Sequence, residues 1–178
     1  MSTAETTSSQ GSPFWRFSLR LYRAPKVADA CIALQEEAGV DVNLLLFLLW
    51  QASLRRALTS AEVTALEGRI GAWREMTVIP LRALRRALKS PPELVEPQTA
   101  EAFRTRIKAV ELEAERLQQE AMYELAGATP RGQDAPSLAD AARGNIAAYE
   151  AMGGKAFPKP AIETLLAALP ASGRTTEE

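Results

Sequence analysis

The apolar residues of this chain recur at helical spacing between Gly and Pro breaks, and no alternating run is long enough to predict a sheet. The most apolar block, residues 44–50, follows Asp41 and Asn43, either of which can cap a helix N-terminus. A helix that is apolar on every face must be surrounded by other helices. At about 1.5 Å per residue, this block is too short to cross the roughly 30 Å hydrocarbon core of a bilayer. The sequence therefore predicts an all-α fold, a single helical bundle around a central apolar helix at residues 41–56.

Two helices are predicted before the central one, over residues 12–23 and 25–38. Ser12 and Pro13 suit the N-cap and first position of the first helix, and Gly39 can end the second in a left-handed conformation. We expect the aromatic residues of the first helix to pack on the central helix rather than to lie on a membrane surface. These aromatic residues are Phe14, Trp15, Phe17 and Tyr22.

Two helical segments are predicted after the central helix. Thr59 and Glu62 form a capping box, and the apolar pattern that follows continues to Leu88. Pro80 either kinks this helix or separates two abutting helices.

The longest predicted helix runs from Pro97 to about Leu125. Its apolar residues alternate at spacings of four and three, which is a heptad-like seam for an antiparallel neighbour or, less favoured, for a second chain. The predicted seam comprises Phe103, Ile107, Val110, Ala114, Leu117 and Ala121.

The domain prediction is one helical bundle over residues 12–126, followed by a flexible link at 127–136. A C-terminal helical arm is predicted over residues 137–169, either packed on the bundle or flexibly attached. The ends of the chain, residues 1–11 and 170–178, lack apolar periodicity and are predicted to be disordered tails.

Composition excludes several classes of chemistry. The chain has 178 residues, a formal net charge of -1 and no histidine, so sites that need an imidazole are absent. The single cysteine, Cys31, lies among apolar residues at helical spacing, which favours a buried thiol over a nucleophile. Because there is neither a cysteine framework nor an apolar signal segment, we expect a reducing, cytoplasmic compartment.

Carboxylate pairs are the remaining candidates for acid/base or metal chemistry. Glu111 and Glu115, and Asp29 with Glu36 and Glu37, have spacings that allow it. Without histidine, a solvated helix face is the favoured interpretation, and no metal or cofactor is predicted. Further along, Asn145, Tyr149 and Glu150 form either a polar site or an exposed surface.

Basic residues form the clearest charged pattern. Residues 52–89 carry a net charge of +5 and residues 96–125 carry −3. The favoured interpretation is that these segments partly neutralise each other as antiparallel neighbours, or are simply solvated. A phosphate or nucleic-acid surface is less favoured, because the basic face lacks the aromatic platform typical of nucleic-acid binding. The candidate partner-binding residues are Arg82, Arg85, Arg86 and Lys89 on one stripe, with Arg16 and Arg20 on the first helix.

Two sequence blocks carry a family resemblance. The block Phe14-Trp-Arg-Phe-Ser-Leu19 and the block Asp41-Val-Asn-Leu-Leu-Leu-Phe47 resemble a proteobacterial family of small helical proteins classed as a domain of unknown function. The resemblance covers residues 12 to about 125. It implies no activity, since no catalytic residue or ligand can be carried over from it.

Three functions remain open, and no catalytic constellation is recognised. The favoured one is a non-enzymatic protein-interaction or regulatory module with a protein partner. The second is a small-molecule or lipid-binding protein with a cavity beside the central helix. The third, and least favoured, is nucleic-acid binding through the basic helix faces. No integral membrane segment is expected, and weak self-association is left open.

Overall fold

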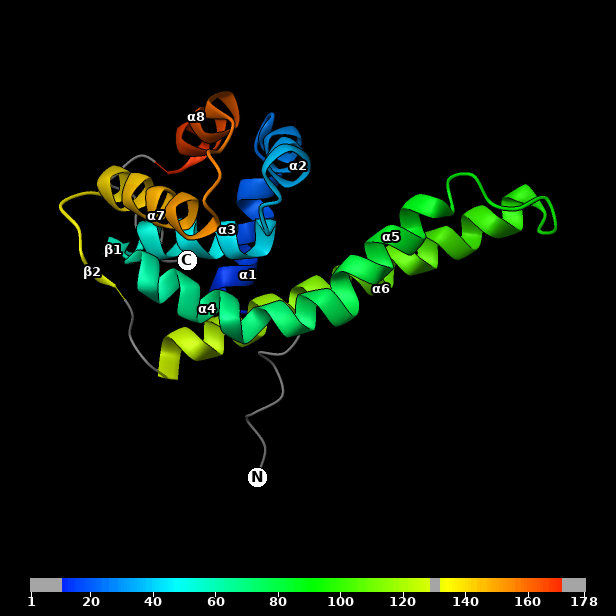
Figure 1. The fold of residues 1–178 in the computed structure, drawn as a ribbon, viewed down its shortest axis with the longest axis horizontal. Coiled ribbons are helices and arrows are strands. Elements are labelled where there is room, and N and C mark those ends of the chain that lie inside the picture. Colours follow the sequence, from blue (N-terminus) through cyan, green and yellow to red (C-terminus); the bar gives the residue numbers. More distant parts are fainter. Residues whose placement is uncertain (1–10, 129–131, 171–178) are drawn as a thin grey trace.

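The computed structural model describes residues 11–128 and 132–170, and it confirms the all-α helical bundle (Figure 1). Two short strands, β1 (Arg56–Ala57) and β2 (Gln133–Asp134), pair antiparallel. The helices are α1 (Pro13–Tyr22), α2 (Val27–Ala38), α3 (Val42–Ser53), α4 (Ser60–Trp73), the π-helical turn η1 (Arg74–Val78), α5 (Ile79–Ala87), α6 (Pro97–Ala128), α7 (Leu138–Gly153) and α8 (Lys159–Ala168). The predicted tails, 1–11 and 170–178, lie almost wholly outside the described residues, as does part of the predicted link at 127–136.

Helix α3 is the centre of the core, as its all-round apolarity predicts. Every residue from 43 to 52 is buried. The ring of Phe14 from α1 lies 5.3 Å from that of Phe47 and 5.4 Å from that of Trp50. Full burial of each large apolar side chain contributes about 1.5–3 kcal/mol, so this helix dominates the stability of the fold. It ends at Ser53, earlier than the predicted residue 56, because the chain turns through a left-handed residue, Arg55 with φ 57, into β1.

The local helix signals are confirmed. Ser12 accepts a hydrogen bond from the Trp15 N–H at the start of α1. Thr59 and Glu62 make both halves of the predicted capping box at the start of α4. Gly39 ends α2 with φ 70, in the left-handed region where a side chain would be strained.

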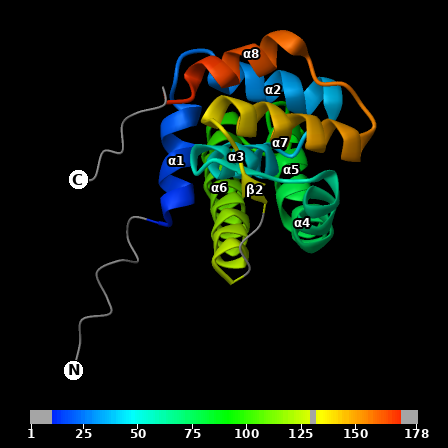
Figure 2. The same ribbon diagram turned by 90° about the vertical axis from the view of Figure 1, so that its left-hand side faces the viewer.

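Helices α7 and α8 cover the face of the core opposite α6, with α7 along α3 and α8 beside α2 (Figure 2). Asn145 of α7 is fully buried and donates to the carbonyls of Leu48 at 2.9 Å and Arg56 at 3.0 Å, while its Oδ1 accepts from the Leu58 N–H at 2.6 Å. It therefore fixes the turn that leaves α3.

The neighbouring polar residues of α7 also make internal contacts. Tyr149 accepts a hydrogen bond from the Asp41 N–H at 2.9 Å, and Glu150 accepts one from the Phe157 N–H at 2.7 Å. Because Asn145 and these two side chains are engaged inside the fold, they act as clamps between helices rather than as an exposed polar surface.

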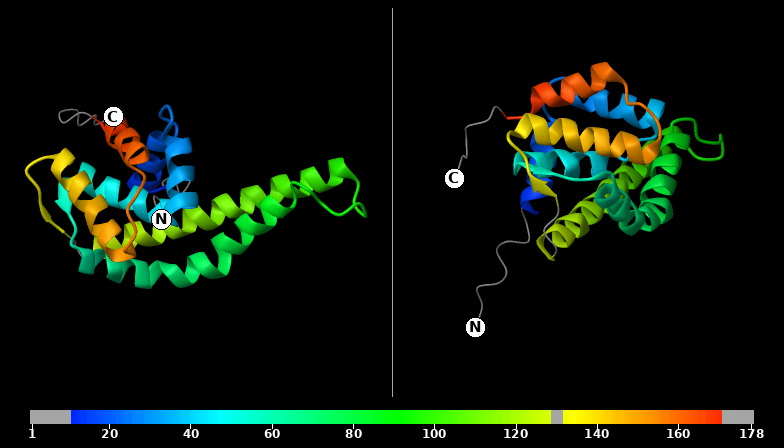
Figure 3. Two further views of the ribbon diagram at one scale, coloured as in Figure 1. Left: turned by 45° about the horizontal axis from the view of Figure 1, so that its top comes forward. Right: turned by 60° about the vertical axis from the view of Figure 1, so that its left-hand side comes forward.

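Helices α4, η1 and α5 run in sequence, antiparallel to α6, and the distal part of this pair projects beyond the other helices (Figures 1 and 3). We call residues 79–118 the hairpin and the packed set α1, α2, α3, α7 and α8 the lobe. The chain does not break at Pro80. The π-helical turn η1 lies just before Pro80. Its wider hydrogen-bond pattern lets the helix continue although proline has no N–H to donate.

The predicted seam on α6 is only partly correct. Ala114 is buried and Ile107 is half-buried, but Phe103, Val110 and Leu117 are 41%, 52% and 44% exposed. The buried stripe of α6 is rotated about the helix axis relative to the predicted seam. It includes Ala100, Glu111, Ala114, Gln118 and Met122. The rotation has a physical cause: charged and amide groups of α6 make specific bonds to the neighbouring helices, and these bonds decide which face turns inward.

Candidate functional site

The contact between α5 and α6 is an ion-pair cluster. Arg82 donates from Nε to Glu111 Oε1 at 3.1 Å and from Nη2 to Glu115 Oε1 at 2.6 Å, and Arg85 also pairs with Glu111. This confirms the favoured interpretation that the basic segment and the acidic helix neutralise each other within the fold.

The two carboxyl groups of this cluster differ in their electrostatics. Burial alone would raise the pKa of Glu111, but hydrogen bonds and charge from Arg85 and Arg82 hold it below its usual range. For Glu115, burial outweighs the attraction of Arg82 and leaves the pKa above its usual range, with Glu111 and Asp41 adding to the rise. Glu111 is therefore the carboxylate that stabilises the hairpin at neutral pH.

The predicted basic stripe is divided between two environments. Arg82 and Arg85 are engaged with α6, whereas Arg86 is more exposed and pairs with Glu36 of α2 at 3.4 Å. Lys89 is exposed at the end of the stripe. On α1, the exposed Arg16 donates to the carbonyl of Gly11 at 2.8 Å, and Arg20 is exposed.

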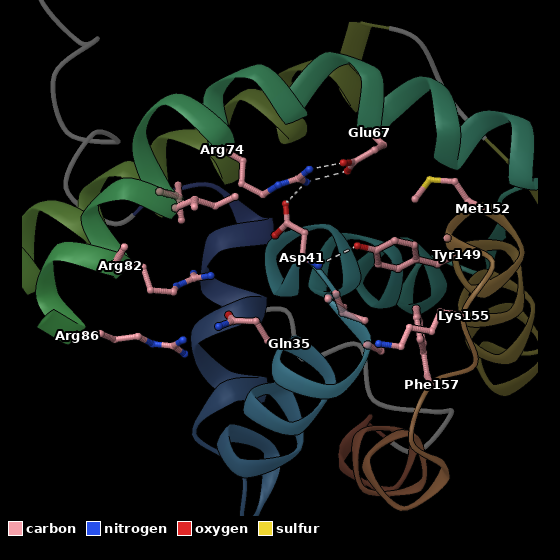
Figure 4. A pocket seen from close by; sticks show the side chains of 17 residues that line it. Gln35, Asp41, Glu67, Arg74, Arg82, Arg86, Tyr149, Met152, Lys155 and Phe157 are labelled. Carbon is pink, nitrogen blue, oxygen red and sulfur yellow. Dashed lines mark hydrogen bonds and ion pairs between the residues drawn. The ribbon is translucent and has the colours of Figure 1, made fainter.

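A pocket of about 580 Å³ lies where the lobe meets the base of the hairpin (Figure 4). Its walls come from the end of α2, the capped start of α3, the η1–α5 segment and the end of α7. It meets α3 at the polar Asp41 rather than along the apolar residues of that helix, which are packed against neighbouring side chains. This pocket is therefore not the cavity that we expected along the apolar residues of the central helix.

The basic side chains that line the pocket are paired within the chain. Arg74 binds both Asp41 and Glu67, and Lys155 donates to the carbonyl of Glu37. The hydrogen bond to Glu67, together with the contact to Asp41, raises the pKa of Arg74 in spite of its burial. With Arg82 and Arg86 also paired, the pocket is a joint at which the basic side chains of the lobe and the hairpin have partners within the same chain.

Four exposed large apolar side chains of the hairpin lie on one side of it, while Ile79 and Leu112 are exposed elsewhere. Leu84 of α5 is 41% exposed, similar to Phe103, Val110 and Leu117 of α6, which follow one another at intervals of seven residues. In an antiparallel helix pair, residues rotated in the same sense from the shared contact lie on the same side. Leu84 comes one residue before Arg85, and Val110 comes one residue before Glu111. Both are therefore rotated in the same sense about their helix axes from the contact between Arg85 and Glu111. We call the surface formed by Leu84, Phe103, Val110 and Leu117 the outer face.

The outer face points away from the lobe. Arg86 lies on the opposite flank of α5 and pairs with Glu36 of α2, which places that flank toward the lobe. Charged side chains border the outer face on α6. The Arg106 guanidinium lies 5.5 Å from the centre of the Phe103 ring, and Glu113 pairs with Arg116 at 2.8 Å. The arrangement is an apolar strip with a charged rim, which is typical of interaction surfaces.

The tip of the hairpin is also apolar. Leu94 is 95% exposed in the loop between α5 and α6, and Val95 beside it is exposed as well. Pro91 and Pro92 restrict the backbone of this loop, so the tip presents its apolar groups in a limited set of conformations.

Comparison with known families assigns most of the chain to one family. A family model described as "Protein of unknown function (DUF2390)" matches residues 13–122. The chain belongs to the DUF2390 family. The match runs from α1 through most of α6 and includes the whole hairpin, while α7 and α8 lie outside it. No curated protein and no solved structure matches the chain.

The described residues contain neither a metal-binding cluster nor a membrane-spanning helix. Within residues 11–128 and 132–170, no three His, Cys, Asp or Glu side chains are grouped so that they could hold a metal ion. Over the same residues, no helix is both long and apolar enough to cross a membrane.

The outer face is the feature that sequence reasoning missed. The periodicity of α6 identified its apolar residues but not the direction in which they face. The opposite charges of Arg82 and Arg85 on one helix and Glu111 on the other were the available signal, since pairing them rotates the seam away from α5.

Proposed function

We propose that this protein is a non-enzymatic, cytoplasmic protein-interaction module whose docking surface is the outer face of the hairpin. The observation that carries the proposal is the exposure of Leu84, Phe103, Val110 and Leu117 on one side of a projecting arm. Contiguous apolar groups bordered by charges are costly to leave in water, and they mark surfaces that bind another protein. The partner that fits is a helix or helix pair with an apolar stripe.

The energetics of such docking are favourable without any rearrangement of the core. Complete burial of a large apolar side chain contributes about 1.5–3 kcal/mol, and about half of that gain remains for each residue of the outer face. Arg106 and Glu113, at the rim, are placed to orient the partner and to fix its register.

The lobe and α4 hold the base of the hairpin in a fixed position. Trp73 donates from its indole N–H to the Ala114 carbonyl at 3.0 Å. Gln118 donates to Asp41 at 2.7 Å, and Gln119 donates to Asn43 at 2.7 Å, so α6 is bonded to the start of the central helix. A rigid arm loses little conformational entropy on binding, which supports a docking role.

Site-specific photo-crosslinking in cells tests this proposal. A photoreactive residue is placed at Val110 on the outer face, at Lys108 on the opposite flank of the same helix, or at the exposed Arg143 on the lobe. We expect a discrete crosslinked protein species from position 110 and from neither control position. Equal yields at the three positions, or no species from position 110, would contradict the proposal.

A second variant separates binding from folding. Val110→Glu puts a charge into the middle of the outer face and leaves the core unchanged. It should abolish the crosslink formed from a photoreactive residue at Leu84 while the helical circular dichroism and the melting temperature stay close to those of the parent protein. If the crosslink from Leu84 persists at full yield, the outer face is not the docking surface.

A further inference from the structure

We infer that the occupant of the outer face is a second copy of this chain, docked antiparallel about a two-fold axis close to Val110. This inference rests on the proposed function and names the partner. An isologous contact of this kind requires a surface that is complementary to itself when rotated by half a turn. The sequence of charges and apolar groups on α6 meets that requirement.

The charged rim of α6 is antisymmetric about its centre. Arg106 and Glu113 lie one heptad apart on the same rim, and the midpoint between them falls beside Val110. When two copies of α6 pack antiparallel at this point, Arg106 of each copy lies opposite Glu113 of the second copy. The interface then gains two opposite-charge pairs from one symmetric arrangement.

Other arrangements of the same helices bring like charges together. Parallel packing in register places Arg106 against Arg106 and Glu113 against Glu113. An antiparallel arrangement shifted by one heptad along the helix brings Glu113 opposite Glu113 of the second copy. The rim therefore selects both the antiparallel direction and the register, as charged flanking positions do in coiled coils.

The apolar groups fit the same arrangement. In this register Phe103 of one copy comes to lie near Leu117 of the second copy, and the two Val110 side chains meet at the axis. The exposed apolar strips of the two copies thus face each other along their length, and Leu84 of α5 adds a second row on each copy. The product is a four-helix bundle made of two hairpins.

The rest of the molecule leaves this surface open. The Arg86–Glu36 pair places α2 on the opposite flank of the hairpin, so α2 lies outside the proposed bundle. In the single chain, Arg106 is stacked on Phe103, and Glu113 pairs with Arg116. Both contacts are solvent-exposed and therefore weak enough to be shared with a second copy.

Analytical ultracentrifugation of the full chain with charge-reversal variants tests the inference. The wild type should show a monomer–dimer equilibrium. Arg106→Glu and Glu113→Arg should each weaken the dimer by about ten-fold or more, because each places like charges opposite each other twice. The double variant should recover wild-type affinity to within about three-fold, since both pairs are restored with reversed sign.

Mixing the two single variants tests the pairing of Arg106 with Glu113 most specifically. An equimolar mixture of Arg106→Glu and Glu113→Arg should form a heterodimer, in which an acidic rim meets a basic rim, although each variant alone stays monomeric. Lys108→Glu, a matched reversal on the opposite flank, should dimerise like the wild type. Circular dichroism and melting curves confirm that every variant is folded.

Two results would overturn the inference. One is a wild type that stays monomeric at every concentration reached, and the other is a mixture of the two single variants with no heterodimer. The proposed function can survive this failure: if Val110 crosslinks to a different protein while the purified chain is monomeric, the outer face is a docking surface whose occupant is not a second copy.

Discussion

Asp41 joins the central helix to the hairpin through Arg74. Its Oδ1 accepts from the Asn43 N–H at 2.9 Å and caps α3, while its Oδ2 accepts from Arg74 Nη1 at 2.9 Å. One buried carboxylate thus caps the core helix and anchors the η1 turn from which the hairpin extends. The position of the arm relative to the lobe depends on this contact.

Replacement of Asp41 should destabilise the fold more than loss of a helix cap does. Asp41→Ala should lower the free energy of unfolding by about 3–4 kcal/mol, of which about 1 kcal/mol is the cap and the rest is the buried guanidinium left with Glu67 alone. Asp41→Asn, which retains a capping oxygen, should lose less. Urea denaturation provides the measurement, and a loss below about 1 kcal/mol for Asp41→Ala would refute the role of this contact.

The two carboxylates of the hairpin should respond oppositely to neutralisation. Because its pKa is lowered in the folded protein, Glu111 contributes stability above its unfolded pKa, and this contribution is lost as the pH falls through the folded value. Glu111→Gln should therefore lower the free energy of unfolding at pH 7 by about 1–3 kcal/mol.

Glu115 is the matched control, since its pKa is raised and its charged form is penalised by burial. Glu115→Gln should be neutral or stabilising at pH 7. Urea denaturation of both variants at neutral and acid pH distinguishes them, and equal losses would show that the two carboxylates are not electrostatically distinct.

Alkaline pH should destabilise the protein through Cys31. This thiol is 1% exposed, and burial raises its pKa from 9.0 to about 12. A raised folded pKa contributes stability that is complete below the unfolded value and is lost as the pH rises toward the folded value, with a slope of at most about 1.4 kcal/mol per pH unit. Burial also raises the pKa of Tyr149, so part of the slope should remain in Cys31→Ala.

The measurement for Cys31 is the free energy of unfolding between about pH 8 and pH 11. The wild type should lose stability more steeply than Cys31→Ala over this window. Thiol-specific reagents should also label the native protein only as fast as it unfolds. Rapid labelling under native conditions would mean that the thiol is accessible.

Asn145 should be among the residues most sensitive to substitution. Asn145→Leu keeps the branched shape of the side chain but leaves the carbonyls of Leu48 and Arg56 and the N–H of Leu58 without this partner. Buried backbone groups that lose their partners cost about 1–3 kcal/mol each, so the free energy of unfolding should fall by about 3 kcal/mol or more. Arg143→Ala, at an exposed position of the same helix, should be neutral. A comparable loss in both variants would contradict the role of Asn145.

Features set by local chemistry were predictable from the sequence. The burial of α3, the Ser12 cap and the Thr59–Glu62 capping box each depend on a few neighbouring residues, and the structure contains them where they were predicted. The pairing of Arg82 and Arg85 with acids of α6 was predictable from complementary net charge.

Features set by contacts between distant segments were not predictable. The side of α6 that faces inward is decided by the bonds of Glu111 and Gln118 to α5 and Asp41, which no periodicity reveals. The role of Asn145 likewise depends on carbonyls 97 and 89 residues away. The outer face itself follows from that rotation, so it became visible only in three dimensions.

Methyl NMR of leucine-labelled full chain tests the central claim, that the outer face is a docking surface, most directly. Spectra are compared between dilute and concentrated protein, and again after addition of any protein captured at Val110. The methyl groups of Leu84 and Leu117 should shift together with saturable binding, while those of the exposed Leu54 on the lobe and of the buried Leu48 should not. Shifts confined to Leu54 or to other lobe positions, with Leu84 and Leu117 unchanged, would contradict it.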